Sequence, residues 1–118
     1  MTTTSLLTRT ALADALVAED HAEETGFLDP LDRITCPVHR RWIHECCHSD
    51  LHVSQVSGHR WCRPCRRALD VAVDEVSRTV RLHCPRCDRG ARTRADAQLL
   101  AACEASLAAA SAPVRRAA

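Results

Sequence analysis

The sequence predicts a small α+β protein, in which a β-hairpin body stabilised by bound metal is flanked by an N-terminal and a C-terminal helix. Three features predict this class. Eight cysteines stand in 118 residues, apolar side chains alternate between two cysteine pairs, and helical periodicity appears on both sides of the cysteine-rich segment. Only Phe27, Trp42 and Trp61 are aromatic. Because so few large apolar residues cannot build a sizeable core, we expect metal ions to staple the chain.

The chain divides into three segments that differ in charge. Residues 1–32 are predicted to form an acidic helix and linker, with a net charge of −6. Residues 33–92 form a Cys/His-rich body, and residues 93–118 form a second helix with a basic tail. These two segments together carry a net charge of +7. The length is typical of a single domain.

The first helix is predicted from Ser5 to about Glu24. Leu12, Leu16 and neighbouring apolar residues recur at helical spacing, Ser5 can cap the start, and Gly26 ends the pattern. Acidic residues gather toward the C-terminal end of this helix, where they oppose the helix dipole. We therefore expect the helix to dock on a basic surface, in this chain or in a partner.

Period-2 alternation predicts a β-hairpin between residues 69 and 84, with its turn at residues 74–78. Residues 42–46 and 51–56 are weaker strand candidates. The alternating apolar residues of the hairpin are Leu69, Val71, Val73, Val80, Leu82 and Cys84.

The second helix is predicted from about Arg94 to Ala110. Thr93 and Asp96 have the spacing of a capping box at its start. Leu99, Cys103 and Leu107 follow at positions i, i+4 and i+8. Cys103 is therefore expected to be a small core residue rather than a ligand or nucleophile.

Two Cys-x2-Cys pairs, Cys62/Cys65 and Cys84/Cys87, are separated by eighteen residues. Zinc takes four thiolate or imidazole ligands in a tetrahedron, and the predicted hairpin would bring the second pair back beside the first. The arrangement resembles zinc-ribbon and treble-clef-type zinc-binding proteins over about residues 36–90. That resemblance implies a structural zinc ion held by these four cysteines.

The segment 36–52 offers more ligands than a second zinc site needs. Cys36 and His39 form a knuckle, and we expect Cys46 with either Cys47 or His48 to complete the site. The ligands can be wired sequentially, or interleaved as a cross-brace similar to RING-type domains; the hairpin favours the sequential order. Four other histidines are expected to be exposed or hydrogen-bonded rather than ligands: His44, His52, His59 and His83.

Residues 61–65, Trp-Cys-Arg-Pro-Cys, resemble the active-site motif of thioredoxins. That family places the motif between a buried strand and a helix, whose N-terminus lowers the pKa of a thiol. Here a polar segment precedes the motif, and residues 66–76 alternate with period two. A thiol–disulfide oxidoreductase acting through Cys62 and Cys65 is therefore a remote alternative, and we expect no enzymatic activity.

Every strongly basic residue of the chain is an arginine, and most of these arginines lie near the cysteine pairs. Arginine suits bidentate recognition of phosphate or carboxylate. Trp42 and Trp61 can stack on unpaired bases, or fill the small core beneath the knuckles. The predicted partner surface comprises Arg40, Arg41, Trp42, Arg60, Trp61, Arg63, Arg66, Arg67, Arg86 and Arg89.

The sequence thus indicates a zinc-binding module that binds nucleic acid or a protein of the transcription machinery through this surface. The alternative is a protein–protein interaction or assembly role that uses the acidic N-terminal helix. We find no secretory pattern at the N-terminus and no apolar run long enough to span a membrane. We therefore expect a cytoplasmic protein whose paired cysteines bind metal.

Overall fold

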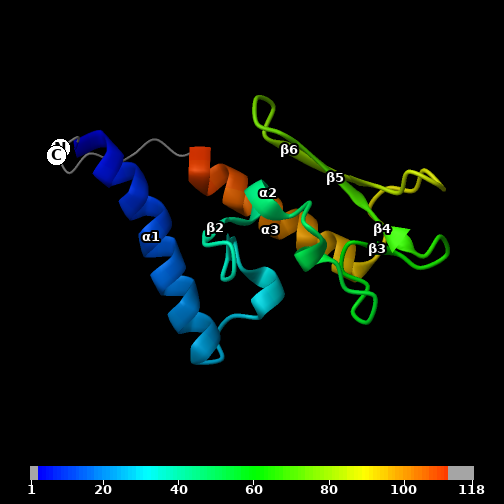
Figure 1. Cartoon of the computed structure of the whole chain (residues 1–118), viewed down its shortest axis with the longest axis horizontal. Coiled ribbons are helices and arrows are strands. Elements are labelled where there is room, and N and C mark those ends of the chain that lie inside the picture. The colour runs from blue at the N-terminus through cyan, green and yellow to red at the C-terminus, as the bar shows by residue number, and fades with distance from the viewer. Residues whose placement is uncertain (1–2, 112–118) are drawn as a thin grey trace.

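The computed structural model describes residues 3–111, with the side chains of residues 11–111, and confirms the predicted α+β class. In this part of the chain, three antiparallel hairpins lie between an N-terminal and a C-terminal helix (Figure 1). Within residues 3–111, no helix combines the length and apolar character that a membrane span requires. In chain order, with η for a 3₁₀ helix, the elements are α1 (Thr3–Glu24), η1 (Pro30–Asp32), β1 (Thr35–Cys36), β2 (Arg41–Trp42), α2 (Ile43–Cys46), η2 (Asp50–His52), β3 (Trp61–Cys62), β4 (Arg67–Ala68), β5 (Asp70–Asp74), β6 (Thr79–His83) and α3 (Arg94–Ser111).

Three tight turns each begin at a cysteine and share one backbone shape. The residue four positions after that cysteine has a positive φ in each turn: Arg40 (56°), Arg66 (51°) and Asp88 (65°). The amide of Arg40 donates to the carbonyl of Cys36 at 2.9 Å, and the amide of Asp88 donates to that of Cys84 at 2.8 Å. Residues other than glycine adopt this left-handed region rarely, so its recurrence at the same position after each cysteine marks three turns of one type.

The predicted hairpin is strands β5 and β6, and its register confirms the alternation. Val71 pairs with Leu82, and Val73 pairs with Val80. Val80 and Leu82 are buried, while the two residues opposite are half-buried against the same core. Asp74 stabilises the turn, since its carboxylate accepts hydrogen bonds from two backbone amides of residues 76–77. The hairpin thereby brings Cys84 and Cys87 back beside Cys62 and Cys65.

Helix α3 forms the centre of the core and packs against α2, β6 and η1. Leu99, Cys103 and Leu107 are at most 1% exposed, which confirms Cys103 as a core residue. The helix begins with the predicted capping box. Thr93 Oγ1 accepts a hydrogen bond from the amide of Asp96 at 3.1 Å, and Asp96 Oδ2 accepts one from the amide of Thr93 at 3.0 Å. Figure 1 shows α3 between α1 and the β5–β6 hairpin.

Helix α1 is fixed to strand β1 by a carboxylate. Glu19 accepts hydrogen bonds from the backbone amides of Ile34 and Thr35 at 2.9 and 2.8 Å, and from the Thr35 hydroxyl at 2.6 Å. These donors precede Cys36 directly. Because hydrogen bonds to a charged group are stronger than neutral ones, Glu19 restrains the strand that carries this cysteine.

A buried arginine completes the docking of α1. Arg33, 3% exposed, pairs with Asp20 at 2.8 Å and with Glu23 at 3.0 Å. Arg40 also pairs with Asp20, at 3.0 Å. The guanidinium groups of Arg33 and Arg40 lower the pKa of Asp20. The acidic end of α1 therefore docks on arginines of its own chain.

Two strand predictions were wrong. Only Arg41–Trp42 is extended around residues 42–46, and the rest of that segment is helix α2. Ile43, Cys46 and Cys47 are buried, and their spacing is that of one face of a helix. A helix of a single turn is too short to produce a periodic pattern that can be recognised in the sequence. Residues 51–56 contain the end of η2 and one isolated bridge from Ser54 to His59.

We predict that Arg33→Met loosens α1 and lowers the free energy of unfolding by about 1–3 kcal/mol, because a buried guanidinium and its carboxylate partners lose their hydrogen bonds. The lower part of that range reflects the solvent exposure of Asp20 and Glu23, at 40% and 35%. Urea unfolding of metal-loaded protein measures the change. Arg81→Met, at an exposed position of β6, is the matched control, and equal stability of both variants would contradict the role of Arg33.

Candidate metal centres

One group of potential metal ligands, called the four-cysteine centre, combines the two predicted pairs: Cys62, Cys65, Cys84 and Cys87. Their Sγ atoms all lie within 4.8 Å of one another. The Sγ atoms of Cys62 and Cys87 are 3.8 Å apart. Four thiolates that each lie about 2.3 Å from one zinc ion in a tetrahedron are about 3.8 Å apart. The spacing therefore fits a tetrahedral ion.

Two thiols of the four-cysteine centre differ in proton affinity. Burial would raise the pKa of Cys62, but the Cys65 amide and the Arg89 guanidinium lower it to about 6. Burial and the neighbouring thiols of Cys87 and Cys62 raise the pKa of Cys65 to about 12. The Cys65 amide and Arg89 thus favour the thiolate form of Cys62, whereas the surroundings of Cys65 favour its thiol form, and a bound metal ion would favour the thiolate of Cys65 as well.

Arg89 joins the four-cysteine centre to helix α3. Its side chain is 9% exposed, and it donates to Asp96 Oδ2 at 2.7 Å and to the carbonyl of Trp61 at 3.1 Å. Burial would raise the pKa of Asp96, but the Thr93 amide and the Arg89 guanidinium lower it. Arg89 and Asp96 therefore hold the turn that contains Cys62 and Cys65 against the start of helix α3.

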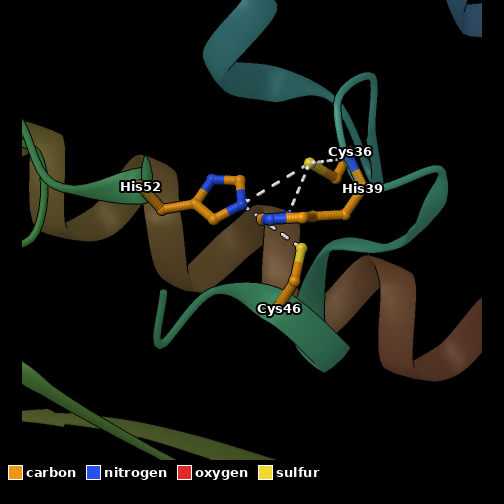
Figure 2. A group of neighbouring side chains, drawn as sticks. All are labelled: Cys36, His39, Cys46 and His52. Atoms are coloured by element: carbon orange, nitrogen blue, oxygen red, sulfur yellow. Dashed lines mark hydrogen bonds between the residues drawn. The ribbon is translucent and has the colours of Figure 1, made fainter. Parts of the chain in front are cut away.

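The second group, called the cysteine–histidine centre, lies between the β1–β2 hairpin, α2 and η2, and Figure 2 shows its side chains converging. It consists of Cys36, His39, Cys46 and His52. Sγ of Cys36 lies 3.4 Å from Nδ1 of His39 and 3.6 Å from Nε2 of His52. Sγ of Cys46 lies 3.2 Å from the same Nε2. A thiolate and an imidazole nitrogen on one tetrahedral zinc ion are about 3.6 Å apart, so this group also has the spacing of a metal site.

His52 takes the position that the sequence assigned to Cys47 or His48. The helical turn of α2 directs Cys46 toward the centre and Cys47 into the core, where it is 1% exposed. His48 is exposed. Ser49 caps η2 by accepting a hydrogen bond from the amide of Leu51. This turn places the His52 side chain beside Cys36 and Cys46. Burial and nearby positive groups, beginning with His39, lower the pKa of His52 to about 4, which leaves the imidazole neutral for ligation.

The arginines of the predicted partner surface fall into two groups. Arg60 is buried and donates to the carbonyl of Cys47, Arg40 pairs with Asp20, and Arg89 belongs to the link described above. These three arginine side chains therefore stabilise the fold. Of these three, Arg40 is nevertheless exposed, and so are all the other arginines of the predicted surface: Arg41, Arg63, Arg66, Arg67 and Arg86.

Of the four histidines that the sequence predicted to be exposed or hydrogen-bonded rather than ligands, three lie outside both centres, and the prediction was wrong for His52. His44 and His83 are hydrogen-bonded, to Ser106 and Asp88 respectively. His59 differs from the expectation: it is 6% exposed, and its Nδ1 has no hydrogen-bond partner among the described residues.

Sequence reasoning missed one pattern at residues 44–48, which spell His-Glu-Cys-Cys-His. Metalloproteases place two histidines at this spacing on a helix. Here α2 ends at Cys46, which belongs to the cysteine–histidine centre, and neither His44 nor His48 is a member of the two centres.

The two centres use separate stretches of the chain, residues 36–52 and residues 62–87. The wiring is therefore sequential, and the cross-brace is ruled out. The protein is a small α+β chain with two Cys/His groups that can hold metal ions. No protein-family model matches it, and no curated protein or solved structure matches it either.

We predict that His52→Ala lowers the metal content from two ions per chain to one, because the cysteine–histidine centre loses a ligand. His48→Ala, an exposed position four residues earlier, is the control and should keep both ions. Elemental analysis of purified, desalted protein measures the ratio. Loss of an ion from the His48 variant alone would reverse the assignment.

We also predict that Asp96→Asn lowers the free energy of unfolding by about 2–4 kcal/mol, since the buried Arg89 loses its charged partner and the helix cap is weakened. Glu104→Gln, an isosteric change at an exposed position of the same helix, is the control. Urea unfolding at constant metal loading gives both values. A loss no greater than that of the control would show that the buried pair is dispensable.

Proposed function

We propose that this protein is a non-enzymatic zinc-binding module that binds single-stranded nucleic acid beside the four-cysteine centre. The binding region, called the Trp61 surface, consists of Trp61, Arg63, Arg66, Arg92 and Arg94. The proposal depends on one observation: Trp61 lines two neighbouring cavities, and Arg63 lines both of them as well.

Zinc is the metal that the donor atoms favour. Sets of four cysteines, or of two cysteines and two histidines, with tetrahedral spacing are typical of structural zinc, while hard cations prefer oxygen ligands. All four positions of each centre are filled by protein side chains. Such closed sites stabilise a fold and leave no position for a reacting water molecule, which supports a role without catalysis.

The Trp61 surface has the charge that phosphate groups require. Arg63, Arg92 and Arg94 line a cavity of about 280 Å³, and Arg63 and Arg66 line a second cavity of about 420 Å³. No carboxylate lines either cavity within the described chain. The N-terminus of α3 contributes the positive end of its dipole at the same place. Arginines that neutralise phosphates release counterions, and this release favours binding.

Trp61 supplies a flat apolar side chain between these arginines. It is half-buried, and its backbone is held by pairing with Ala68 and by the bond from Arg89. Because this backbone is already fixed, only the side-chain rotation of Trp61 is lost when a base stacks on the ring. Stacking of one base on an aromatic side chain contributes about 1–3 kcal/mol and is tolerant of sequence. We therefore propose unpaired DNA or RNA as the ligand.

Two alternatives have less support. A protein-interaction role for the acidic helix α1 needs free carboxylates, but Glu19, Asp20 and Glu23 are engaged by their own chain. A thiol–disulfide oxidoreductase needs a separate dithiol, whereas Cys62 and Cys65 lie among the thiols of the four-cysteine centre. Binding to the transcription machinery would use the same arginines as nucleic acid does.

We predict that the protein binds a fluorescently labelled single-stranded oligonucleotide at about 50 mM salt, and that Trp61→Ala weakens this binding by about 1–3 kcal/mol through loss of stacking. Arg63→Gln should reduce the slope of log affinity against log salt by about 0.7, the value for one phosphate contact on a single strand. Fluorescence anisotropy over a salt series measures both effects.

Trp61→Phe and Arg81→Gln are the controls for these variants. The first keeps a ring that can stack, and the second removes an exposed arginine of β6 that lies outside the Trp61 surface. Both should bind nearly as the wild type does. Absence of binding to either DNA or RNA strands at low salt, with both metal centres loaded, would end the nucleic-acid proposal.

A further inference from the structure

A groove with an acidic lining lies between α2 and the turn of the β5–β6 hairpin, and its volume is about 600 Å³. It shares no residue with the Trp61 surface or with the two metal centres. No arginine lines it within the described chain. The lining combines three carboxylates with three aliphatic side chains: Glu45, Asp74, Glu75, Val71, Val73 and Val76.

His44 presents one ring nitrogen to this groove. Its side chain is 4% exposed, and its Nδ1 lies 2.8 Å from Oγ of Ser106. The Ser106 hydroxyl donates its own proton to the carbonyl of Cys103 at 3.0 Å, so Oγ accepts the proton of Nδ1. Nε2 of His44 is therefore left as an acceptor, and it lies on the side of the groove.

Glu75 faces the same nitrogen. Its Oε1 lies 3.9 Å from Nε2 of His44. An ionised carboxylate has no proton to donate, so these two acceptors cannot satisfy each other. A donor nitrogen placed between them can lie about 2.9 Å from both, which is the ordinary length of such hydrogen bonds. The pair therefore fits a ligand that carries N–H donors.

The charge of the groove requires that this ligand be a cation. Hydrogen bonds from Ser77, first of all from its amide, lower the pKa of Asp74, so the Asp74 carboxylate stays ionised. Glu45 and Glu75 are exposed carboxylates of the same lining. Three negative groups without an arginine attract cations and repel phosphate. The inference is therefore independent of the nucleic-acid proposal.

The valines favour a cation on an aliphatic stem. Val71 and Val73 are half-buried and Val76 is exposed along the same groove. An arginine side chain packs its methylene groups on apolar surface while its charged end stays polar. Its guanidinium group has five N–H donors in one plane and is more weakly hydrated than the ammonium group of lysine.

We propose that this groove binds an arginine side chain of a protein partner. The guanidinium group donates to His44 Nε2 and to Glu75, and the aliphatic stem packs on Val71 and Val73. Val76 then contacts an apolar side chain close to that arginine in the partner. In an extended segment the residue two positions away lies on the same side, so the partner carries an arginine followed at that spacing by an aliphatic residue.

The test uses full-length protein with both metal centres loaded and the peptide acetyl-Arg-Ala-Leu-amide. Nuclear magnetic resonance follows the ring protons of His44 while the peptide is added. We expect a saturable shift of these resonances. The same peptide with glutamine in place of arginine should cause no shift, and the lysine version should bind more weakly. Glu75→Gln should weaken binding of the arginine peptide by about 2–5-fold, the effect of one exposed ion pair.

Glu104→Gln is the matched control, since it removes an exposed carboxylate of α3 that lies outside the groove. It should bind the arginine peptide as the wild type does. Glu75 is exposed, so its variant keeps the fold, and unchanged metal content checks this. The proposal is overturned if the arginine peptide leaves His44 unshifted, if the glutamine or lysine peptide binds as tightly, or if Glu75→Gln has no effect.

Discussion

The convergence of thiol and imidazole side chains on two points is the constraint on which the rest of this fold depends. The apolar residues are too few to replace it: Phe27 is 88% exposed, and six members of the buried cluster are cysteines. A structural zinc ion contributes about 10–16 kcal/mol of binding free energy in zinc-finger peptides. Contributions of that size can offset the entropy lost by long loops and two-residue strands, which hydrophobic burial in a small chain cannot do alone.

Polar contacts around the centres hold the ligand-bearing segments in place. Glu19 binds the backbone just before Cys36, and Arg89 binds both Asp96 and the carbonyl of Trp61. Each of these contacts joins a knuckle to one of the long helices. The helices therefore pre-orient the ligand side chains, and a bound metal ion would in turn order the short hairpins between them. This mutual dependence explains why several arginines near the cysteines are buried and unavailable to a partner.

The proposed binding region depends on arginines that the fold leaves exposed. A zinc ion held by the four thiolates would have a net charge of −2, and the Arg89 guanidinium, whose side chain is 9% exposed, would lie next to that charge. Arg63, Arg66, Arg92 and Arg94 are exposed and line the cavities beside Trp61. The small overall charge of +1 conceals this division, because the acidic residues of α1 are neutralised elsewhere, by Arg33 and Arg40.

The sequence alone determined the features that depend on short-range spacing. The Cys-x2-Cys pairs, the period-2 hairpin of residues 69–84 and the capped helix from Arg94 each follow from regular residue spacing within one short segment of the chain. Tertiary structure decided the rest. Whether Cys47, His48 or His52 completes a centre depends on a single helical turn and a serine-capped 3₁₀ turn, which are too short to leave a periodic signal. Likewise, which arginines face solvent depends on burial by distant segments, and residue spacing along one segment does not specify that burial.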